Sequence, residues 1–258
     1  MDELNINSLV DHHKKILHVN NHPYGHCTTK KFLPEEVIKS ISSSFKFPDQ
    51  IDSTSDVLFQ KTKKALNEYN LFPLEIKKII DYLNSKIFIS VLEDKFKINN
   101  LIADPSLFGG GMHESRNGGY LKIHSDFIYI RKKKLKRMLN LLLYLNDTWD
   151  EEWGGAIELW DQKMENNFVK LFPKINSAVI FRTDTESNHG FPDPITCPKN
   201  IGRKSLALYY YINDNSLFKR TKFFYARWKR RPGIDEPKFG DNRNFLERFK
   251  NSFLFRFK

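Results

Sequence analysis

The hydrophobic positions of the chain follow one pattern up to about Asn100 and a different one after it. In the first hundred residues, apolar side chains recur at the three- and four-residue spacing of an amphipathic helix. A proline followed by two glutamates, at Pro34–Glu36, is typical of a helix start. We therefore expect a mostly helical region, with helices over residues 34–45, 56–69 and 74–92 and one short strand over residues 16–20.

Beyond residue 100 the sequence changes to short β-rich runs separated by glycine, asparagine, aspartate and proline. Spacers such as Asn117–Gly119 and Gly154–Gly155 are too short for crossover helices, so the sheet should be mostly antiparallel. This pattern predicts a mainly β fold with α support, either a barrel or a sandwich. The expected strands are Leu101–Phe108, Tyr120–Ile128, Met138–Leu145, Ala156–Trp160, Phe168–Phe172, Ser177–Arg182 and Ser205–Ile212.

The end of the chain returns to a helical pattern. Phe245, Phe249 and Phe253 are spaced four apart within Asp241–Phe257, which predicts an amphipathic helix. A phenylalanine stripe of this kind usually packs against a core, so we expect the helix to lie on the barrel or to form the contact of a homodimer. The alternative is a helix lying on a membrane surface.

The charge of the chain is positive but unevenly distributed. Over 258 residues, 42 Lys and Arg face 31 Asp and Glu, a formal net charge of +11. Residues 219–258 hold 13 Lys and Arg against 4 Asp and Glu, and residues 131–137 hold six more basic side chains. A nucleic-acid interface would need such patches joined with aromatic residues in one groove or a known binding motif, and we see neither. We therefore do not expect a nucleic-acid partner.

Other features of the composition limit the class of protein. No apolar run approaches the length of about 20 residues that a membrane-spanning helix needs, so we expect no membrane span. The first residues lack the basic and apolar segments of a secretory signal. Only two cysteines are present, Cys27 and Cys197, so a disulfide framework is not the design and we expect a reducing, cytoplasmic setting.

The candidate chemistry lies in three residues, His124, Asp126 and His189. His124 and Asp126 are two apart near the end of an expected strand, so their side chains project to the same face. His189 follows another β-rich run and would come from elsewhere in the barrel. Two imidazoles and one carboxylate on one face of an octahedral ion leave three positions open, the arrangement associated with non-haem Fe(II) oxygenases. Alone, a His-x-Asp pair is a weak signal, since such coincidences occur by chance.

Three further segments add context to this triple. These segments are Arg137–Asn146 (RMLNLLLYLN), Trp153–Leu159 (WGGAIEL) and His189–Tyr211, and their order and spacing along the chain matter as well. Together with the His-x-Asp pair, they resemble the Fe(II)/2-oxoglutarate-dependent dioxygenases of the prolyl 4-hydroxylase-like superfamily over roughly residues 100–215. The resemblance implies a double-stranded β-helix, the cupin-like jelly roll of two facing sheets, flanked by N-terminal helices and a C-terminal helix.

The resemblance also implies a division of the chain. It indicates a single oxygenase domain over residues 1–258, with a helical support region over residues 1–100. The catalytic core would span residues 101–216, and a basic extension would follow over residues 217–258.

The same resemblance implies roles for individual residues. His124, Asp126 and His189 would hold Fe(II), which 2-oxoglutarate chelates through its ketone and C1 carboxylate. Arg203 follows the distal histidine by 14 residues and has the planar fork that pairs with a carboxylate, here the C5 carboxylate of the co-substrate. Ser205 shares the face of Arg203, and Tyr144 matches a position where related enzymes place a tyrosine against that carboxylate.

The implied reaction uses O2 and 2-oxoglutarate to hydroxylate a C–H bond, with release of succinate and CO2. The presence of Asp126 favours hydroxylation over halogenation, because halogenating relatives lack this carboxylate. The substrate would be a prolyl group, an amino acid or another small molecule. As candidate substrate residues we name Arg137, where related sequences repeat an arginine seven residues before the tyrosine, and Tyr120. The alternative for Arg137 is a salt bridge to the acidic region 145–195.

Two other classes of function stay open at this point. One is a non-catalytic β-sandwich binding module that uses the basic tail for an anionic partner. The other is a cupin-type isomerase or lyase that keeps the metal and ignores 2-oxoglutarate. In that second case, Arg203 would form an ordinary buried ion pair with a protein carboxylate.

Overall fold

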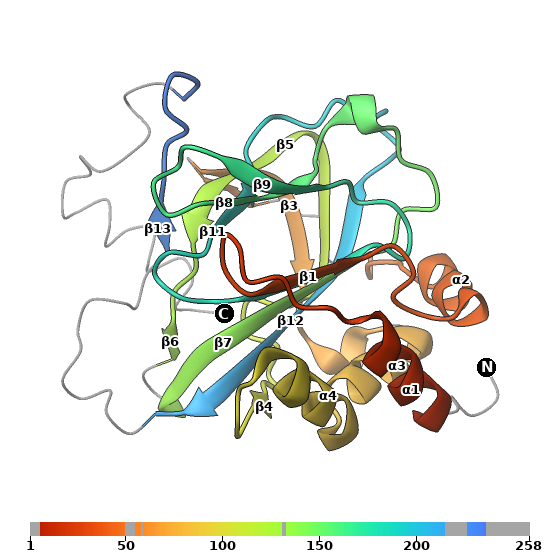
Figure 1. The fold of residues 1–258 in the computed structure, drawn as a ribbon. Helices are drawn as coiled ribbons and strands as arrows, with labels where there is room; N and C mark the ends of the chain where they lie inside the picture. Colours follow the sequence, from red (N-terminus) through yellow and green to blue (C-terminus); the bar gives the residue numbers. More distant parts are fainter. Residues whose placement is uncertain (1–5, 50–54, 58, 131–132, 215–225, 236–258) are drawn as a thin grey trace.

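The computed structural model describes residues 6–49, 55–57, 59–130, 133–214 and 226–235, which form a β-barrel covered on one side by α-helices (Figure 1). The helices are α1 (Ile6–Ile16), α2 (Glu35–Ser43), α3 (Leu74–Leu83) and α4 (Lys86–Phe96). The first strands are β1 (His26–Thr29), β2 (Ser55–Val57), β3 (Gln60–Leu66), β4 (Ile102–Ala103), β5 (Gly111–Ser125), β6 (Tyr129–Ile130) and β7 (Leu135–Tyr144). They are followed by β8 (Ile157–Trp160), β9 (Asn167–Leu171), β10 (Ala178–Arg182), β11 (Asn188–Phe191), β12 (Arg203–Asn213) and β13 (Arg227–Trp228).

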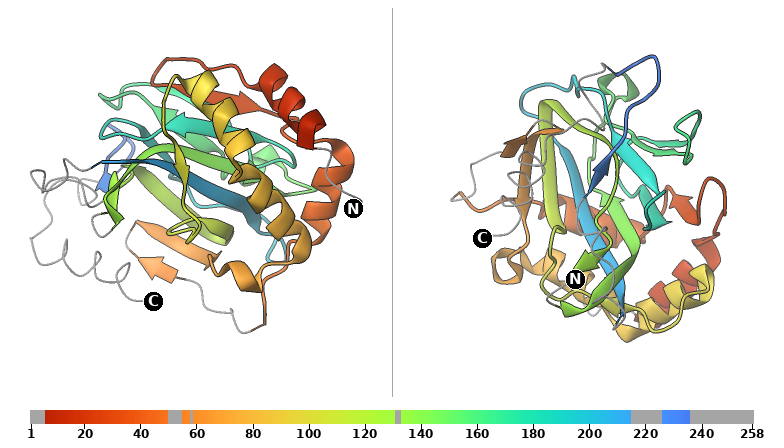
Figure 2. Two further views of the ribbon diagram at one scale, coloured as in Figure 1. Left: turned by 90° about the horizontal axis from the view of Figure 1, so that it is seen from below. Right: turned by 90° about the vertical axis from the view of Figure 1, so that its left-hand side faces the viewer.

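The strands pair in the order β1-β10-β7-β12-β5-β11-β8-β9, and every pair of strands is antiparallel. The 15-residue strand β5 joins the two halves of the barrel. Its residues 111–115 pair with β12, and its later residues pair with β11. The result is two sheets that face each other (Figure 2). The prediction of an antiparallel jelly roll is therefore confirmed.

Alternate residues of β12 face opposite sides of the sheet, as in any strand. Leu206, Leu208 and Tyr210 belong to the core between the sheet and the helices. Arg203 and Ser205 therefore face the interior of the barrel. The alternation thus separates a structural face from a face that is available for chemistry.

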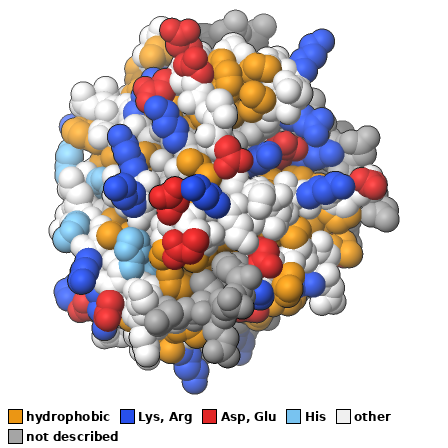
Figure 3. Space-filling view, turned by 90° about the vertical axis from the view of Figure 1, so that its right-hand side faces the viewer, with side chains coloured by type: hydrophobic (Ala, Val, Ile, Leu, Met, Phe, Trp, Pro, Cys, Tyr) orange, Lys and Arg blue, Asp and Glu red, His pale blue; other side chains and the backbone are white. Residues whose placement is uncertain are grey.

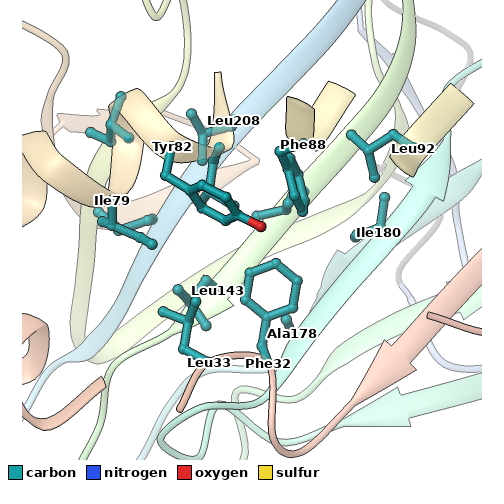
Figure 4. Close-up of a cluster of buried hydrophobic side chains, with 14 of the residues drawn as sticks. Phe32, Leu33, Ile79, Tyr82, Phe88, Leu92, Leu143, Ala178, Ile180 and Leu208 are labelled. Atoms are coloured by element: carbon teal, nitrogen blue, oxygen red, sulfur yellow. The ribbon is translucent and has the colours of Figure 1, made fainter. Parts of the chain in front are cut away.

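The core between the sheet and the helices is apolar and rich in aromatic rings. Figure 4 shows side chains from α3 and α4, such as Tyr82 and Phe88, meeting side chains of the sheet, such as Leu143 and Ile180. Burying side chains of this size contributes roughly 2 kcal/mol each to stability. This face of the sheet is thus fixed by packing, which holds the strands in register for the opposite face.

The largest difference from the sequence expectation concerns residues 56–69. They were expected to form a helix, but β2 and β3 form an antiparallel pair there, and β3 lies along one edge of β5. Pairing with β5 supplies hydrogen bonds and a buried position for Leu66, which outweighs the weak helical spacing of this lysine-rich stretch. The first hundred residues therefore contribute strands as well as helices.

Other boundaries also differ from the expectation. The strand expected over residues 16–20 is absent, because helix α1 runs to Ile16 and only Asn20 forms a bridge. The expected helix over 74–92 is two helices, since α3 ends at Leu83 and Ser85 caps α4 by accepting a hydrogen bond from the Phe88 amide. The spacer Asn117–Gly119 lies inside β5. The domain boundaries named from the sequence stay predictions.

The structure describes most of the basic segment 131–137 but none of the residues of the predicted C-terminal helix. Residues 133 and 134 of the basic segment lie between β6 and β7, which pair as a hairpin. The helix predicted over Asp241–Phe257 lies outside the described residues. On the face in Figure 3, basic and acidic side chains are interspersed. No helix in the described ranges has the length and hydropathy that crossing a membrane requires.

His13 of α1 is fully buried in the helical layer. Its Nδ1 lies 2.7 Å from the Leu9 carbonyl oxygen and 2.9 Å from the Tyr82 hydroxyl, and its Nε2 has no hydrogen-bond partner. The rings of Phe32 and Phe88 pack against the imidazole at 4.6 and 5.0 Å between centroids. Burial among these groups, with a smaller effect of neighbouring His12, lowers the pKa of His13 from 6.5 to about 4.

This lowered pKa makes stability depend on pH. Between pH 6.5 and 4 the unfolded chain binds a proton at His13 that the folded chain rejects, so the free energy of unfolding should fall as the pH drops. The fall assigned to this residue is about 3 kcal/mol over that range. Denaturant unfolding of a His13→Gln variant should show a shallower loss of stability with falling pH. The neighbouring variant His12→Gln is the control, and equal slopes for the two variants and the natural chain would contradict the assignment.

Candidate metal centre

Strands β5 and β11 bring the three predicted metal ligands together. His124 and His189 are directly paired across the two strands, and Asp126 follows the end of β5. One ligand atom from each of the three side chains lies within 4.8 Å of the others. Asp126 Oδ1 lies 3.4 Å from His124 Nε2, and Asp126 Oδ2 lies 3.8 Å from His189 Nε2. The triple that the sequence predicted is thus one cluster.

The hydrogen bonds of the two histidines show that this cluster fits a cation. His124 Nδ1 lies 2.9 Å from the Lys122 carbonyl oxygen, and His189 Nδ1 lies 2.9 Å from the Ser187 carbonyl oxygen. Each Nδ1 therefore carries the proton and donates it, so each Nε2 offers a lone pair. Two such lone pairs facing the carboxylate of Asp126 form a set of three acceptors, which repel one another unless a positive ion lies among them.

Two side chains of β7 hold the carboxylate of Asp126. Arg137 Nη1 donates to Oδ2 over 2.9 Å, and the Asn140 amide donates to the same oxygen over 3.3 Å. Burial raises the pKa of Asp126, but the charge of Arg137 outweighs this effect, so the pKa lies well below its usual range. Burial, with His124 as the second influence, lowers the pKa of His189 to about 4. Asp126 is therefore a carboxylate and His189 a neutral imidazole, which are the states that bind metal.

A second cluster lies next to the metal ligands on the inner face of β12 and β7. Arg203 Nη2 donates to the Tyr144 hydroxyl over 2.8 Å, and Ser205 pairs with Tyr144 across the strands. The Arg203 guanidinium lies 4.1 Å from the centre of the Phe191 ring. No carboxylate in the described part of the chain forms an ion pair with Arg203. A buried guanidinium of this kind fits the carboxylate of a bound ligand.

Comparison with known proteins agrees with this geometry. Residues 110–211, which span β5 to β12, match the family model described as the 2OG-Fe(II) oxygenase superfamily. Over this segment, which carries the three candidate metal ligands and Arg203, the chain is similar to the 2OG-Fe(II) oxygenase superfamily. The protein is thus a 2-oxoglutarate-dependent dioxygenase that uses Fe(II), 2-oxoglutarate and O2.

Solved structures share the fold of this oxygenase. A Pseudomonas putida prolyl-4-hydroxylase superposes with a TM-score of 0.50 and 12% identity, over 81% of this chain and 99% of that chain. A Phytophthora capsici prolyl 4-hydroxylase gives a TM-score of 0.55 and 15% identity, over 99% of this chain and 75% of that chain. No curated protein sequence matches the chain. At these identities the likeness establishes the fold and leaves the substrate open.

Gly155, the second residue of the Gly154–Gly155 pair, positions the side chain of Arg203. Gly155 has a φ of +71°, and a Cβ at this position would lie 3.2 Å from Trp149 and Ile195 side-chain atoms and 3.4 Å from the side chain of Arg203. The Gly155 carbonyl oxygen accepts a hydrogen bond from Arg203 Nε over 2.7 Å. Glycine is therefore required both for the backbone conformation and for the close approach of the guanidinium.

An apolar wall completes the interior beside both clusters. Tyr144 and Phe181 belong to one buried group with Ile157, Leu159 and Val179. The Phe181 ring lies 4.5 Å from the His189 ring. Such a lining excludes water from the space between the metal ligands and Arg203, which strengthens the electrostatic interactions there.

The structure places the two candidate substrate residues differently from the expectation. The side chain of Arg137 is 1% exposed and lies between the rings of Phe127 and Tyr209, at 4.0 and 3.7 Å. Its ion pair is with Asp126 and not with the acidic region 145–195. Tyr120 is partly exposed on β5 beside Lys122, whose ammonium lies 5.2 Å from its ring centre. A substrate contact for either residue stays a prediction.

A further residue near the metal ligands was not found from the sequence. Trp228 of β13 pairs with His124 of β5, and its ring lies 4.9 Å from the His124 ring and 4.5 Å from Phe59, on which it stacks. Arg231 holds this segment to the barrel by a bidentate salt bridge, in which its two terminal nitrogens donate to the two carboxylate oxygens of Asp193 over 2.8 and 2.7 Å. The only sequence signal was a tryptophan within a basic tail, which does not indicate a metal site.

We expect Trp228 to fix the orientation of the His124 ring. A Trp228→Leu variant should bind metal on the order of 10-fold more weakly, because residues that orient a ligand contribute this much to affinity. A Trp228→Phe variant keeps an aromatic face and should lie close to the natural chain. Competition of Co(II) binding against a chelator measures the affinity. Phe168→Leu, an exposed aromatic of β9, is the matched control, and unchanged affinity in Trp228→Leu would contradict the role.

Proposed function

We propose that the enzyme hydroxylates an unactivated C–H bond of a prolyl, amino-acid or other small-molecule substrate. In the balanced reaction, one O2 and one 2-oxoglutarate convert R–H into R–OH, with release of succinate and CO2. The observation that carries the proposal is the coexistence of three metal-binding acceptors with a buried Arg203 that has no protein carboxylate as partner in the described ranges.

The roles of the residues follow from their surroundings. His124, Asp126 and His189 would hold Fe(II), which supplies the redox chemistry that O2 needs to react with a C–H bond. Arg203, supported by Tyr144 and placed by Gly155, would hold the C5 carboxylate of 2-oxoglutarate. We assign Ser205 to the same carboxylate, since it pairs with Tyr144 on that inner face.

The competing functions receive less support. A cupin-type isomerase or lyase would use Arg203 in an ion pair with a protein carboxylate, and no described residue provides one. A binding module without catalysis would not need two histidines whose free lone pairs face a carboxylate. The presence of Asp126 favours hydroxylation over halogenation. The Phytophthora capsici and Pseudomonas putida enzymes are prolyl hydroxylases, which makes prolyl peptides the first substrates to test.

The partners and location that we expected remain proposals. We propose a cytoplasmic enzyme without a nucleic-acid partner. A homodimer through residues 241–257 belongs with these proposals, although that segment lies outside the described residues.

Co-substrate binding tests the role of Arg203. Anaerobic addition of 2-oxoglutarate to the Fe(II)-loaded protein should produce a metal-to-ligand charge-transfer band. An Arg203→Gln variant should bind 2-oxoglutarate about 10- to 100-fold more weakly, the loss of a charge-assisted contact, while keeping its affinity for metal. The control is Lys204→Gln, because Lys204 points to the opposite face of β12. Equal affinities in the two variants would contradict the assignment.

Substrate oxidation tests the class of reaction. Prolyl peptides, free amino acids and small metabolites should be incubated with Fe(II), 2-oxoglutarate and O2, and their masses compared before and after. A substrate should gain one oxygen atom for each succinate formed, and an Asp126→Ala variant should lose this product because a metal ligand is missing. A natural chain that binds Fe(II) but forms no succinate, with or without substrate, would refute the dioxygenase assignment.

A further inference from the structure

Strand β3 turns one lysine toward the interior of the barrel. Leu66 of β3 lies in the helix-side core together with its partner Met112 of β5 and with Leu206 of β12, which pairs with Met112. Because side chains alternate along a strand, Lys64 shares that outer face and Lys63 faces the opposite side. Lys63 therefore points into the same space as the metal ligands and Arg203.

The register of three strands places Lys63 and Arg203 in one row. Both residues pair with Ser115 of β5, Lys63 from one edge of that strand and Arg203 from the other. Two strand spacings put their backbones about 10 Å apart on the same inner face. Two cationic side chains of this length can approach one small ligand from two sides.

The electrostatics of the interior agree with this placement. Burial lowers the pKa of Lys63 to about 8, Asp126 opposes the shift, and Arg203 lowers it further. Lys63 is thus within electrostatic reach of both the metal carboxylate and the arginine. Burial, together with Lys63 and Arg203, also lowers the pKa of His113 well below its ordinary value, so this neighbouring imidazole is neutral.

Lys63 has no acidic partner of its own within the described ranges. Asp126 is already bound by Arg137, at 2.9 Å, and no ion pair joins Lys63 to another described carboxylate. The side chain is nevertheless partly accessible, so the ammonium faces a space that a ligand or solvent can fill. A cation in this position is costly unless an anion comes to it.

We propose that Lys63 is a second cationic contact for bound 2-oxoglutarate, which lies with its two carboxylates between Arg203 and Lys63. This inference rests on the proposed role of Arg203 and adds a residue to the co-substrate site. Lys63 raises the affinity for a dianionic 2-oxo acid and contributes to the preference for 2-oxoglutarate over 2-oxo acids with one carboxylate. The alternative, a contact with an anionic group of the oxidised substrate, predicts no effect on 2-oxoglutarate binding.

The test measures the dissociation constant of 2-oxoglutarate in the Fe(II)-loaded full chain under anaerobic conditions, from its charge-transfer band. A Lys63→Gln variant should bind 2-oxoglutarate about 10- to 100-fold more weakly, and Lys63→Arg should recover most of the affinity. The matched control is Lys61→Gln, an exposed lysine of the same strand. A Lys63→Gln affinity within about twofold of the control would overturn the proposal.

A comparison of two ligands identifies the carboxylate concerned. The monocarboxylate 2-oxopentanoate keeps the ketone and C1 carboxylate and lacks the C5 carboxylate. If Lys63→Gln weakens only 2-oxoglutarate, Lys63 contacts the C5 carboxylate; if it weakens both ligands, Lys63 contacts the C1 carboxylate. Either result supports a contact between Lys63 and 2-oxoglutarate, but only the first supports the preference over 2-oxo acids with one carboxylate. Weakening of neither ligand overturns the proposal.

Thermal unfolding keeps the test independent of activity and of folding defects. Removing this unpaired, partly buried charge should leave the metal-loaded Lys63→Gln protein at least as stable as the natural chain, while 2-oxoglutarate should raise its Tm by less. A natural chain that binds metal but not 2-oxoglutarate would refute the proposed function itself. Normal binding by both the natural chain and Lys63→Gln would refute only the role of Lys63.

Discussion

The pairing of β5 along the edge that it shares with β12 and β11 is the constraint on which the fold and the site depend. Its early residues pair with β12, which carries Arg203, and its late residues carry His124 and pair with β11, which carries His189. A shift of one residue in this register would turn His124 out of the barrel. The distance between the candidate metal ligands and Arg203 is therefore set by the hydrogen bonds of one strand.

The interior of the barrel holds charges that the protein alone does not balance. Asp126 is matched by Arg137, but Arg203 and Lys63 face the same space without a described acidic partner. Apolar walls lower the local dielectric and strengthen the repulsion between these cations. An anionic ligand with two carboxylates relieves both charges at once, whereas a ligand with one carboxylate leaves a cation unpaired. With the proposed roles of Arg203 and Lys63, the interior would therefore favour a dianion before any metal contact is counted.

The sequence predicted the parts that depend on local pattern. The antiparallel strands after Asn100 follow from alternation and short turns, and the cluster around His124 follows from two-residue spacing on one strand. The hairpin that carries Lys63 was wrongly expected to be helical, because its strand state depends on pairing with β5, a partner more than forty residues away. The position of Trp228 against His124 depends equally on a distant pairing, which no local pattern contains.

The ion pair between Arg137 and Asp126 explains how a carboxylate with two oxygens can serve a site that needs open positions. Arg137 and Asn140 both donate to Oδ2, while Oδ1 lies 3.4 Å from His124 Nε2 and receives neither of these bonds. The carboxylate is thereby prevented from turning both oxygens toward one ion. Two imidazoles and one carboxylate oxygen would then hold Fe(II), and coordination positions would stay open for the reactants. Arg137 therefore acts on the open side of the site through Asp126, from a position where it is itself almost wholly buried.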